Sequence, residues 1–174
     1  MAMQTKTIKQ KMNSVQNIGK ITKAMEMISV SKMKRSVEKR ASSHVFAERS
    51  FELLETLATH KNLSHPFLET REGERVLMII VASNKGLCGG YNINVSKQVT
   101  SFIKKHPDTP VDAIVIGKQA ERIAKRNKIE VVASFTEFSD YYTSSEVRSL
   151  LHSVTETYNT NIAYREVVIA YTNF

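Results

Sequence analysis

Residues 8–45 read IKQKMNSVQNIGKITKAMEMISVSKMKRSVEKRASSHV, a stretch that contains no proline and a single glycine, Gly19. Apolar side chains recur in it at helical spacing. They are Ile8, Met12, Val15, Ile18, Ile21, Met25, Ile28, Val30, Met33, Val37, Ala41 and Val45. The stretch continues without proline to about Ala58, which predicts one helix roughly 80 Å long. Such a rod is longer than a compact domain of this size is wide, so it needs something to lie against.

The middle of this predicted helix carries a narrower apolar seam. Ile18, Ile21, Met25 and Ile28 follow one another in steps of three, four and three residues, which is typical of the a and d positions of a coiled coil. No other stretch of the 174 residues is long enough to run alongside it. We therefore expect the seam to pair with another chain or with a segment outside this sequence. In the isolated chain the helix should self-associate or fray.

The charge of the chain is concentrated on the same helix. Residues 1–40 hold ten lysines and arginines and two acids, Glu26 and Glu38, an excess that equals the net charge of +8 for the whole sequence. Basic and acidic residues cancel in the remainder. A basic face of this kind attracts an acidic partner, which can be a nucleic acid, an anionic lipid surface or acidic protein loops.

The remainder of the chain alternates short apolar runs with amphipathic stretches. The predicted strands are 76–82, 111–116, 129–134 and 166–171, the predicted helices are 92–106, 118–127 and 144–158, and the predicted loops include 60–73 and 135–143. Alternation of strands and helices favours a Rossmann-like, doubly wound, mainly parallel sheet. The sequence thus predicts the α/β class, with a helix over 1–60 and an α/β domain over 61–174.

Composition excludes several classes of protein. One cysteine, Cys88, permits no internal disulfide and fits a reducing compartment. The sequence has no apolar run long enough for a transmembrane helix and no signal-peptide core. Its histidines are scattered and its acids are dispersed, which predicts no metal site and no pair of catalytic carboxylates.

A glycine-rich stretch, SNKGLCGGYN at residues 83–92, lies between the first predicted strand and the next helix. Phosphate can bind at such a place, but neither the dinucleotide nor the Walker spacing is present. A cysteine hydrolase would use Cys88 as nucleophile with Asp140 and His152, although His152 falls within a predicted helix. The favoured interpretation is a structural turn built on three glycines, Gly86, Gly89 and Gly90.

Nucleic-acid binding by the basic helix is a competing hypothesis. The basic residues of this helix are mainly lysines, whereas base reading favours arginine. No aromatic residue precedes Phe46, so no stacking platform accompanies the charges. A gel shift that weakens with salt would support this hypothesis.

Two segments carry a resemblance to a known family. SVQNIGKITKAMEM at residues 14–27, followed by SKM at 31–33, resembles the first helix of the gamma subunit of F-type ATP synthase. GLCGGYN at residues 86–92 resembles the second signature of that family, which follows its first strand. The two motifs come in the family's order, and the resemblance spans essentially the whole chain.

The resemblance implies a central-stalk rotor that couples proton-driven rotation to ATP synthesis or hydrolysis on other subunits and is not itself catalytic. It implies no cofactor or metal, and it implies as partners the alpha and beta subunits of the catalytic ring, the epsilon subunit and the ring of c subunits, without nucleic acid. Membrane association would come only through the complex, at the cytoplasmic face of a bacterial plasma membrane. By this likeness Lys20, Lys23 and Met25 face the beta subunits.

Three features depart from the family pattern. Gly19 stands where a side chain such as Gln is usual, and a glycine inside a helix costs about 1 kcal/mol relative to alanine. Asn84 and Lys85 replace a common Asp-Arg pair before the glycine turn. The family's first helix pairs with a long carboxy-terminal helix in an antiparallel coiled coil, and the sequence ends at Phe174 before such a helix. We therefore expect either that the sequence is truncated or that the second half of the shaft is supplied separately.

Overall fold

The computed structural model describes residues 2–59, 65–138 and 143–173. Contacts between Cα atoms divide the chain into two units, Met1–Ser64 and His65–Phe174. The first unit is a helix and the second is an α/β domain. The predicted α/β class, with a long amino-terminal helix and a parallel sheet, is confirmed.

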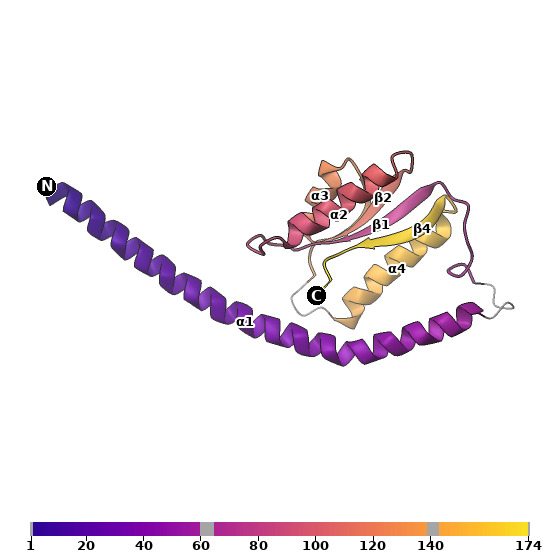
Figure 1. The fold of residues 1–174 in the computed structure, drawn as a ribbon, viewed down its shortest axis with the longest axis horizontal. Helices are drawn as coiled ribbons and strands as arrows, with labels where there is room; N and C mark the ends of the chain where they lie inside the picture. Colours follow the sequence, from indigo (N-terminus) through magenta and orange to yellow (C-terminus); the bar gives the residue numbers. More distant parts are fainter. Residues whose placement is uncertain (1, 60–64, 139–142, 174) are drawn as a thin grey trace. The chain divides into compact units, whose positions relative to one another are not determined.

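The first unit is one continuous helix, α1 (Ala2–Thr59), drawn without a break in Figure 1. Its 58 residues correspond to a length of about 87 Å. Gly19 does not interrupt it. Hydroxyl groups along the helix bond back to the preceding turn, for example Thr22 Oγ1 to the Ile18 carbonyl at 2.9 Å and Ser29 Oγ to the Met25 carbonyl at 2.7 Å. These groups therefore have partners within the helix itself.

The second unit is built on four parallel strands. They are β1 (Arg75–Val81), β2 (Val111–Ile116), β3 (Glu130–Phe135) and β4 (Tyr164–Ala170), in the order β3-β2-β1-β4. Each predicted strand exists, but β4 begins two residues earlier than predicted. Phe135, predicted to open a loop, is the last residue of β3. The predicted loops at 60–73 and 135–143 fall partly outside the described residues.

Three helices connect the strands: α2 (Tyr91–Lys105), α3 (Lys118–Arg126) and α4 (Ser144–Thr160). A capping box fixes the start of α4, because Thr143 N donates to Glu146 Oε2 at 2.6 Å and Glu146 N donates to Thr143 Oγ1 at 3.4 Å. This reciprocal pair satisfies amide groups that have no partner inside the helix. The helix begins where the sequence predicts it.

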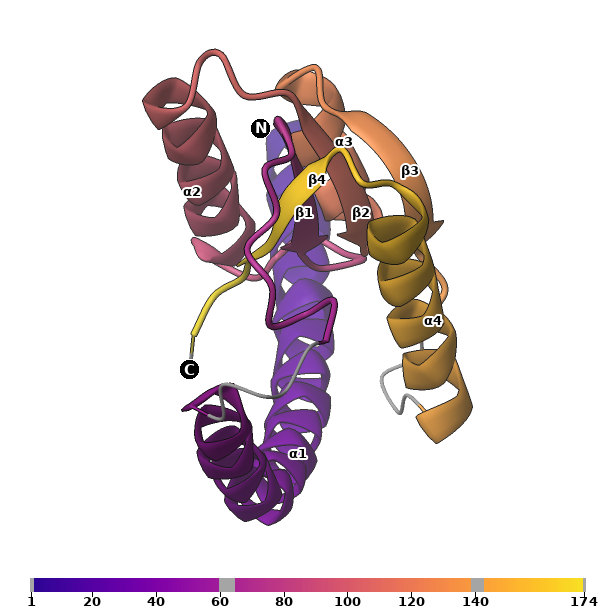
Figure 2. The ribbon, with the colours of Figure 1, turned by 90° about the vertical axis from the view of Figure 1, so that its right-hand side faces the viewer.

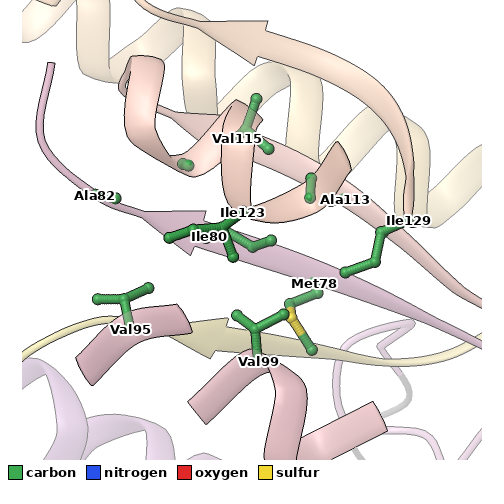
Figure 3. Packing of buried hydrophobic residues seen from close by; sticks show 11 residues of the cluster. Met78, Ile80, Ala82, Val95, Val99, Ala113, Val115, Ile123 and Ile129 are labelled. Atoms are coloured by element: carbon green, nitrogen blue, oxygen red, sulfur yellow. The ribbon is translucent and has the colours of Figure 1, made fainter. Parts of the chain in front are cut away.

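The core has two layers, one on each side of the sheet. Met78 and Ile80 of β1 face α2 and α3, where they pack with Val95, Val99 and Ile123 (Figure 3). The alternate residue Leu77 packs on the other side with Ile114 and with Tyr158 of α4. Figure 2 shows α2 and α4 on opposite sides of the sheet. Because successive side chains of a strand point to opposite faces, a strand buried on both faces is apolar throughout.

Candidate functional site

Helix α1 carries two different faces. Successive residues of an α-helix are separated by about 100° around its axis. Ile18, Ile21, Met25 and Ile28 therefore fall within an arc of about 80°, which we call the seam. Lys20, Lys23 and Met27 fall within an arc of about 60° on the opposite side, which we call the lysine face. Two partners can thus approach the same helix turns from opposite directions.

The seam is open to solvent in this chain. Its side chains are between 51% and 60% exposed, with Met25 the least and Ile21 the most exposed. Aliphatic side chains aligned over three turns are unusual on a free surface, because each gains free energy from burial. The seam therefore has the character of one half of a helix–helix interface.

The lysine face is polar and only partly neutralised. Lys23 Nζ forms an ion pair with Glu26 Oε2 at 2.9 Å, whereas Lys20 forms no salt bridge with any carboxylate that the structure describes. Both members of the Lys23 pair are more than half exposed, so the pair contributes little to stability. The sequence analysis assigned Met25 both to the seam and to the surface that faces the beta subunits. By helical geometry Met25 falls on the seam and Met27 falls between the lysines.

The glycine-rich turn connects β1 to α2. Gly89 has a φ of +57°, which favours glycine, and Gly90 occupies the N-cap position of α2. A Cβ atom added at Gly86 would meet nothing within 4 Å. Leu87 also has a positive φ, +62°, and its side chain is 99% exposed. Among the three glycines, only Gly89 therefore has a backbone conformation that other residues rarely adopt.

Two asparagines fasten this turn to its surroundings. Asn92 Oδ1 accepts a hydrogen bond from Ser83 N at 3.1 Å, and Asn92 Nδ2 donates to Ser83 Oγ at 2.8 Å. Asn84 Oδ1 accepts from Lys118 N at 3.0 Å, which links the end of β1 to the start of α3. The amide of Asn84 thus makes a structural link at the position where the family pattern has an acid.

The groups that a cysteine hydrolase needs are not brought together among the described residues. Cys88 is exposed, and its sulfur lies 3.0 Å from Asn92 Nδ2 and 3.8 Å from Ser83 Oγ. His152 lies on α4 and its Nε2 is 3.5 Å from Glu156 Oε2. Asp140 lies outside the described residues. The arrangement supports the structural interpretation of this turn.

The sequence analysis missed two glycines that the fold requires. Gly117, at the end of β2, has a φ of +92°, and a Cβ atom there would overlap the carbonyl group of Ala82. A Cβ atom at Gly73 would overlap the carbonyl group of Ala163. Both are single glycines that approach a backbone distant in the sequence, so no local motif marks them.

A buried polar cluster was also not predicted from the sequence. Asp112 is 3% exposed and accepts hydrogen bonds from Arg75 Nε at 2.8 Å and from Tyr164 Oη at 2.7 Å, and Arg75 Nη2 contacts its other oxygen. These three residues join β2, β1 and β4. Burial, followed by the hydrogen bond to Asp112, raises the pKa of Tyr164 to about 12. The hydrogen bond to Asp112 also raises the pKa of Arg75. The cluster is structural, because its polar atoms bind one another.

No group of three histidine, cysteine or acidic side chains in residues 2–59, 65–138 and 143–173 could hold a metal ion. Within those same ranges, no helix is both long and apolar enough to cross a bilayer.

The chain is similar to gamma chains of bacterial ATP synthases. An ATP synthase gamma chain of Cupriavidus necator is 37% identical over 175 residues, which cover 98% of this chain and 59% of the relative. That of Cupriavidus pinatubonensis is 40% identical over 139 residues, covering 78% and 48% respectively. That of Glaesserella parasuis serovar 5 is 33% identical over 172 residues, covering 97% and 59%.

The chain spans about half to three fifths of the length of these relatives. The sequence profile described as ATP synthase matches residues 4–174, which include both α1 and the α/β domain. The resemblance found in two short motifs therefore extends over both units, and the chain belongs to the gamma-chain family of ATP synthases.

Proposed function

We propose that this chain is part of the central rotor subunit of a proton-transporting ATP synthase, with α1 as one half of its shaft. The observation that carries the proposal is the exposed seam on a helix of 58 residues. The family match covers residues 4–174 and therefore includes this helix. The seam pairs with a second long helix in an antiparallel coiled coil. The lysine face then points outward, toward acidic loops of the surrounding beta subunits.

This arrangement gives the chain a coupling role without bond chemistry of its own. A shaft with a different surface on each side makes different contacts with three otherwise equivalent neighbours. Each contact stabilises one conformation of the neighbouring catalytic site, and rotation passes that bias from site to site. In this proposal the reacting groups belong to other subunits, and the chain needs no cofactor or metal.

The α/β domain serves as the base of the rotor. In this proposal it joins the shaft, together with the epsilon subunit, to the membrane ring of c subunits, and the alpha and beta subunits surround the shaft. The chain is then peripheral, held by the complex at the cytoplasmic face of a bacterial plasma membrane. The glycine turn at Gly86, Gly89 and Gly90 has a structural role within this base.

Co-expression with alpha and beta subunits of a bacterial relative tests the proposal. With a tag on the beta subunit, we expect this chain to be retained at moderate ionic strength. The double variant Lys20→Glu/Lys23→Glu should weaken retention, because it places acids opposite acidic loops. The matched variant Lys85→Glu/Lys118→Glu carries the same charge change on exposed positions of the α/β domain and should be retained like the wild type.

Absence of retention at every ionic strength would overturn the proposal. Equal weakening by the two double variants would overturn the assignment of the lysine face, because the attraction would then follow total charge. Retention only at very low ionic strength would also count against a specific interface, because unspecific attraction between charges would explain it.

A further inference from the structure

A groove of about 720 Å³ lies between α2 and α3 on the side of the sheet that these helices cover. Its lining runs from Asn92 to Lys105 on α2 and from Gln119 to Arg126 on α3. Along α2 this corresponds to about 20 Å. Five of the lining side chains are cations and none is a carboxylate: Lys97, Lys104, Lys105, Arg122 and Arg126.

The carboxylates that the structure describes do not neutralise the charge of the groove. Lys97, Lys104, Lys105 and Arg126 form no salt bridge with a carboxylate in the part of the chain that the structure describes. Helix α2 contains no acid, and the one acid of α3, Glu121, binds Lys125 at 2.7 Å. That hydrogen bond, with a smaller effect of Arg122, lowers the pKa of Glu121. The groove therefore presents a positive potential to solvent.

Helix dipoles account for only part of this pattern. Lys104, Lys105 and Arg126 lie in the last turns of their helices, where a cation interacts favourably with the carboxy-terminal end. Lys97 and Arg122 lie earlier, where the dipole offers no such gain. Their presence on the two walls of one groove leaves a cationic surface to which an external anion can bind.

We propose that the groove between α2 and α3 binds an acidic segment of a partner protein, laid along the two helices. The concave shape suits a chain segment better than a flat membrane surface. No aromatic residue lines the groove, so bases have no stacking platform. Ile93, which is 59% exposed, and the buried Ile123 add apolar contacts to the cationic walls. Such a mixture fits carboxylates alternating with aliphatic side chains.

The groove lies on the α/β domain, whereas the seam and the lysine face lie on α1, and the groove proposal does not rest on the rotor role. A test of the groove can therefore fail while binding to beta subunits succeeds, and the reverse holds as well. The test must nevertheless control for α1, because the basic residues of that helix attract any acidic peptide.

The experiment measures binding of a fluorescent helical peptide of glutamate, leucine and alanine to the full chain by anisotropy. A peptide with glutamine in place of glutamate serves as the neutral control. We expect Lys97→Gln/Arg122→Gln/Arg126→Gln to weaken binding of the acidic peptide about tenfold, since each exposed ion pair changes affinity roughly two- to fivefold. All three side chains are exposed, so the variant should fold, which circular dichroism verifies.

Two control variants remove the same number of charges elsewhere. Lys85→Gln/Lys118→Gln/Arg148→Gln lies on the α/β domain outside the groove, and Lys6→Gln/Lys9→Gln/Lys11→Gln lies on α1 outside the lysine face. Each should weaken binding no more than about twofold, since only screened long-range attraction is lost. Equal loss in the three variants, or no preference for the acidic over the neutral peptide, would overturn the proposal. The triple groove variant is also tested with phosphatidylglycerol vesicles and with a single-stranded oligonucleotide. If it loses binding to either of these but keeps its binding to the acidic peptide, the proposal is overturned too.

Discussion

Asp112 shows what a single residue decides in this fold. It is the one buried charged side chain among the described residues, and from β2 it accepts hydrogen bonds from Arg75 of β1 and Tyr164 of β4. A buried carboxylate without partners would be strongly destabilising, whereas here both oxygens have donors. No sequence pattern identifies the cluster, because its members are brought together only by the order of the strands.

Removal of the Tyr164 hydroxyl should weaken this cluster. We expect Tyr164→Phe to lower the free energy of unfolding by about 2 kcal/mol, because Asp112 loses a donor that solvent cannot replace. Urea denaturation monitored by circular dichroism measures the change. Arg148→Gln, an exposed substitution on α4, is the control and should change stability by less than about 0.5 kcal/mol.

The raised pKa of Tyr164 predicts that the stability of the domain falls at alkaline pH. Its pKa in the folded state, about 12, lies above the ordinary value of 10.0, so folding favours the neutral phenol. The corresponding stability is fully present below pH 10 and is lost as the pH rises through 12. Urea midpoints measured between pH 9 and 12 should fall more steeply for the wild type than for Tyr164→Phe. Parallel curves would show that Tyr164 does not titrate with folding.

Gly117 and Gly86 should differ in how much stability an alanine substitution costs. Gly117→Ala should cost at least about 3 kcal/mol, since it combines a positive φ with a clash against the backbone of Ala82. Gly86→Ala should change stability by less than about 0.5 kcal/mol, because nothing lies near its Cβ position. Denaturant midpoints of the two variants compare them directly. A larger loss at Gly86 would show that the glycine motif has a steric role that this structure lacks.

At the scale of elements, the sequence is informative wherever periodicity is strong. The alternation of short apolar runs with amphipathic stretches predicts every strand to within two residues. For β1 and β2 the physical reason is burial on both faces, which requires a continuous apolar run. The capping box of α4 gives its start for the same local reason. Helix α1 is predicted from spacing alone. The groove between α2 and α3 is not, because it depends on two helices that are separated by a strand.

The exposed seam predicts self-association of the isolated chain. Sedimentation velocity should show species larger than the monomer that dissociate on dilution. Ile21→Glu should restore the monomer, because it places a charge within the apolar contact. Met27→Glu introduces the same side chain on the lysine face and should leave association unchanged. A monomeric wild type, or equal effects of the two variants, would contradict the role given to the seam.

At the scale of the whole molecule, the two units have different sources of stability. The α/β domain has a core on both sides of its sheet, whereas the described side chains of α1 are exposed along nearly its full length. A long helix without a tertiary contact on its apolar face gains little from burial, so its stability depends on a partner. In the proposed function, that partner is a second shaft helix. Composition alone does not distinguish acidic protein, anionic lipid and nucleic acid as the partner of the basic helix, because all three are negatively charged.

The central claim is that two opposite sides of α1 meet two different partners. Photo-crosslinking tests it most directly, in a complex of alpha and beta subunits with a chimera in which residues 1–174 are followed by the second shaft helix of a gamma chain. A benzoylphenylalanine at position 23 replaces Lys23 and one at position 21 replaces Ile21, about 200° apart around the helix axis. We predict crosslinks from position 23 to a beta subunit and from position 21 to the second shaft helix. Crosslinks from both positions to the same partner would contradict the claim.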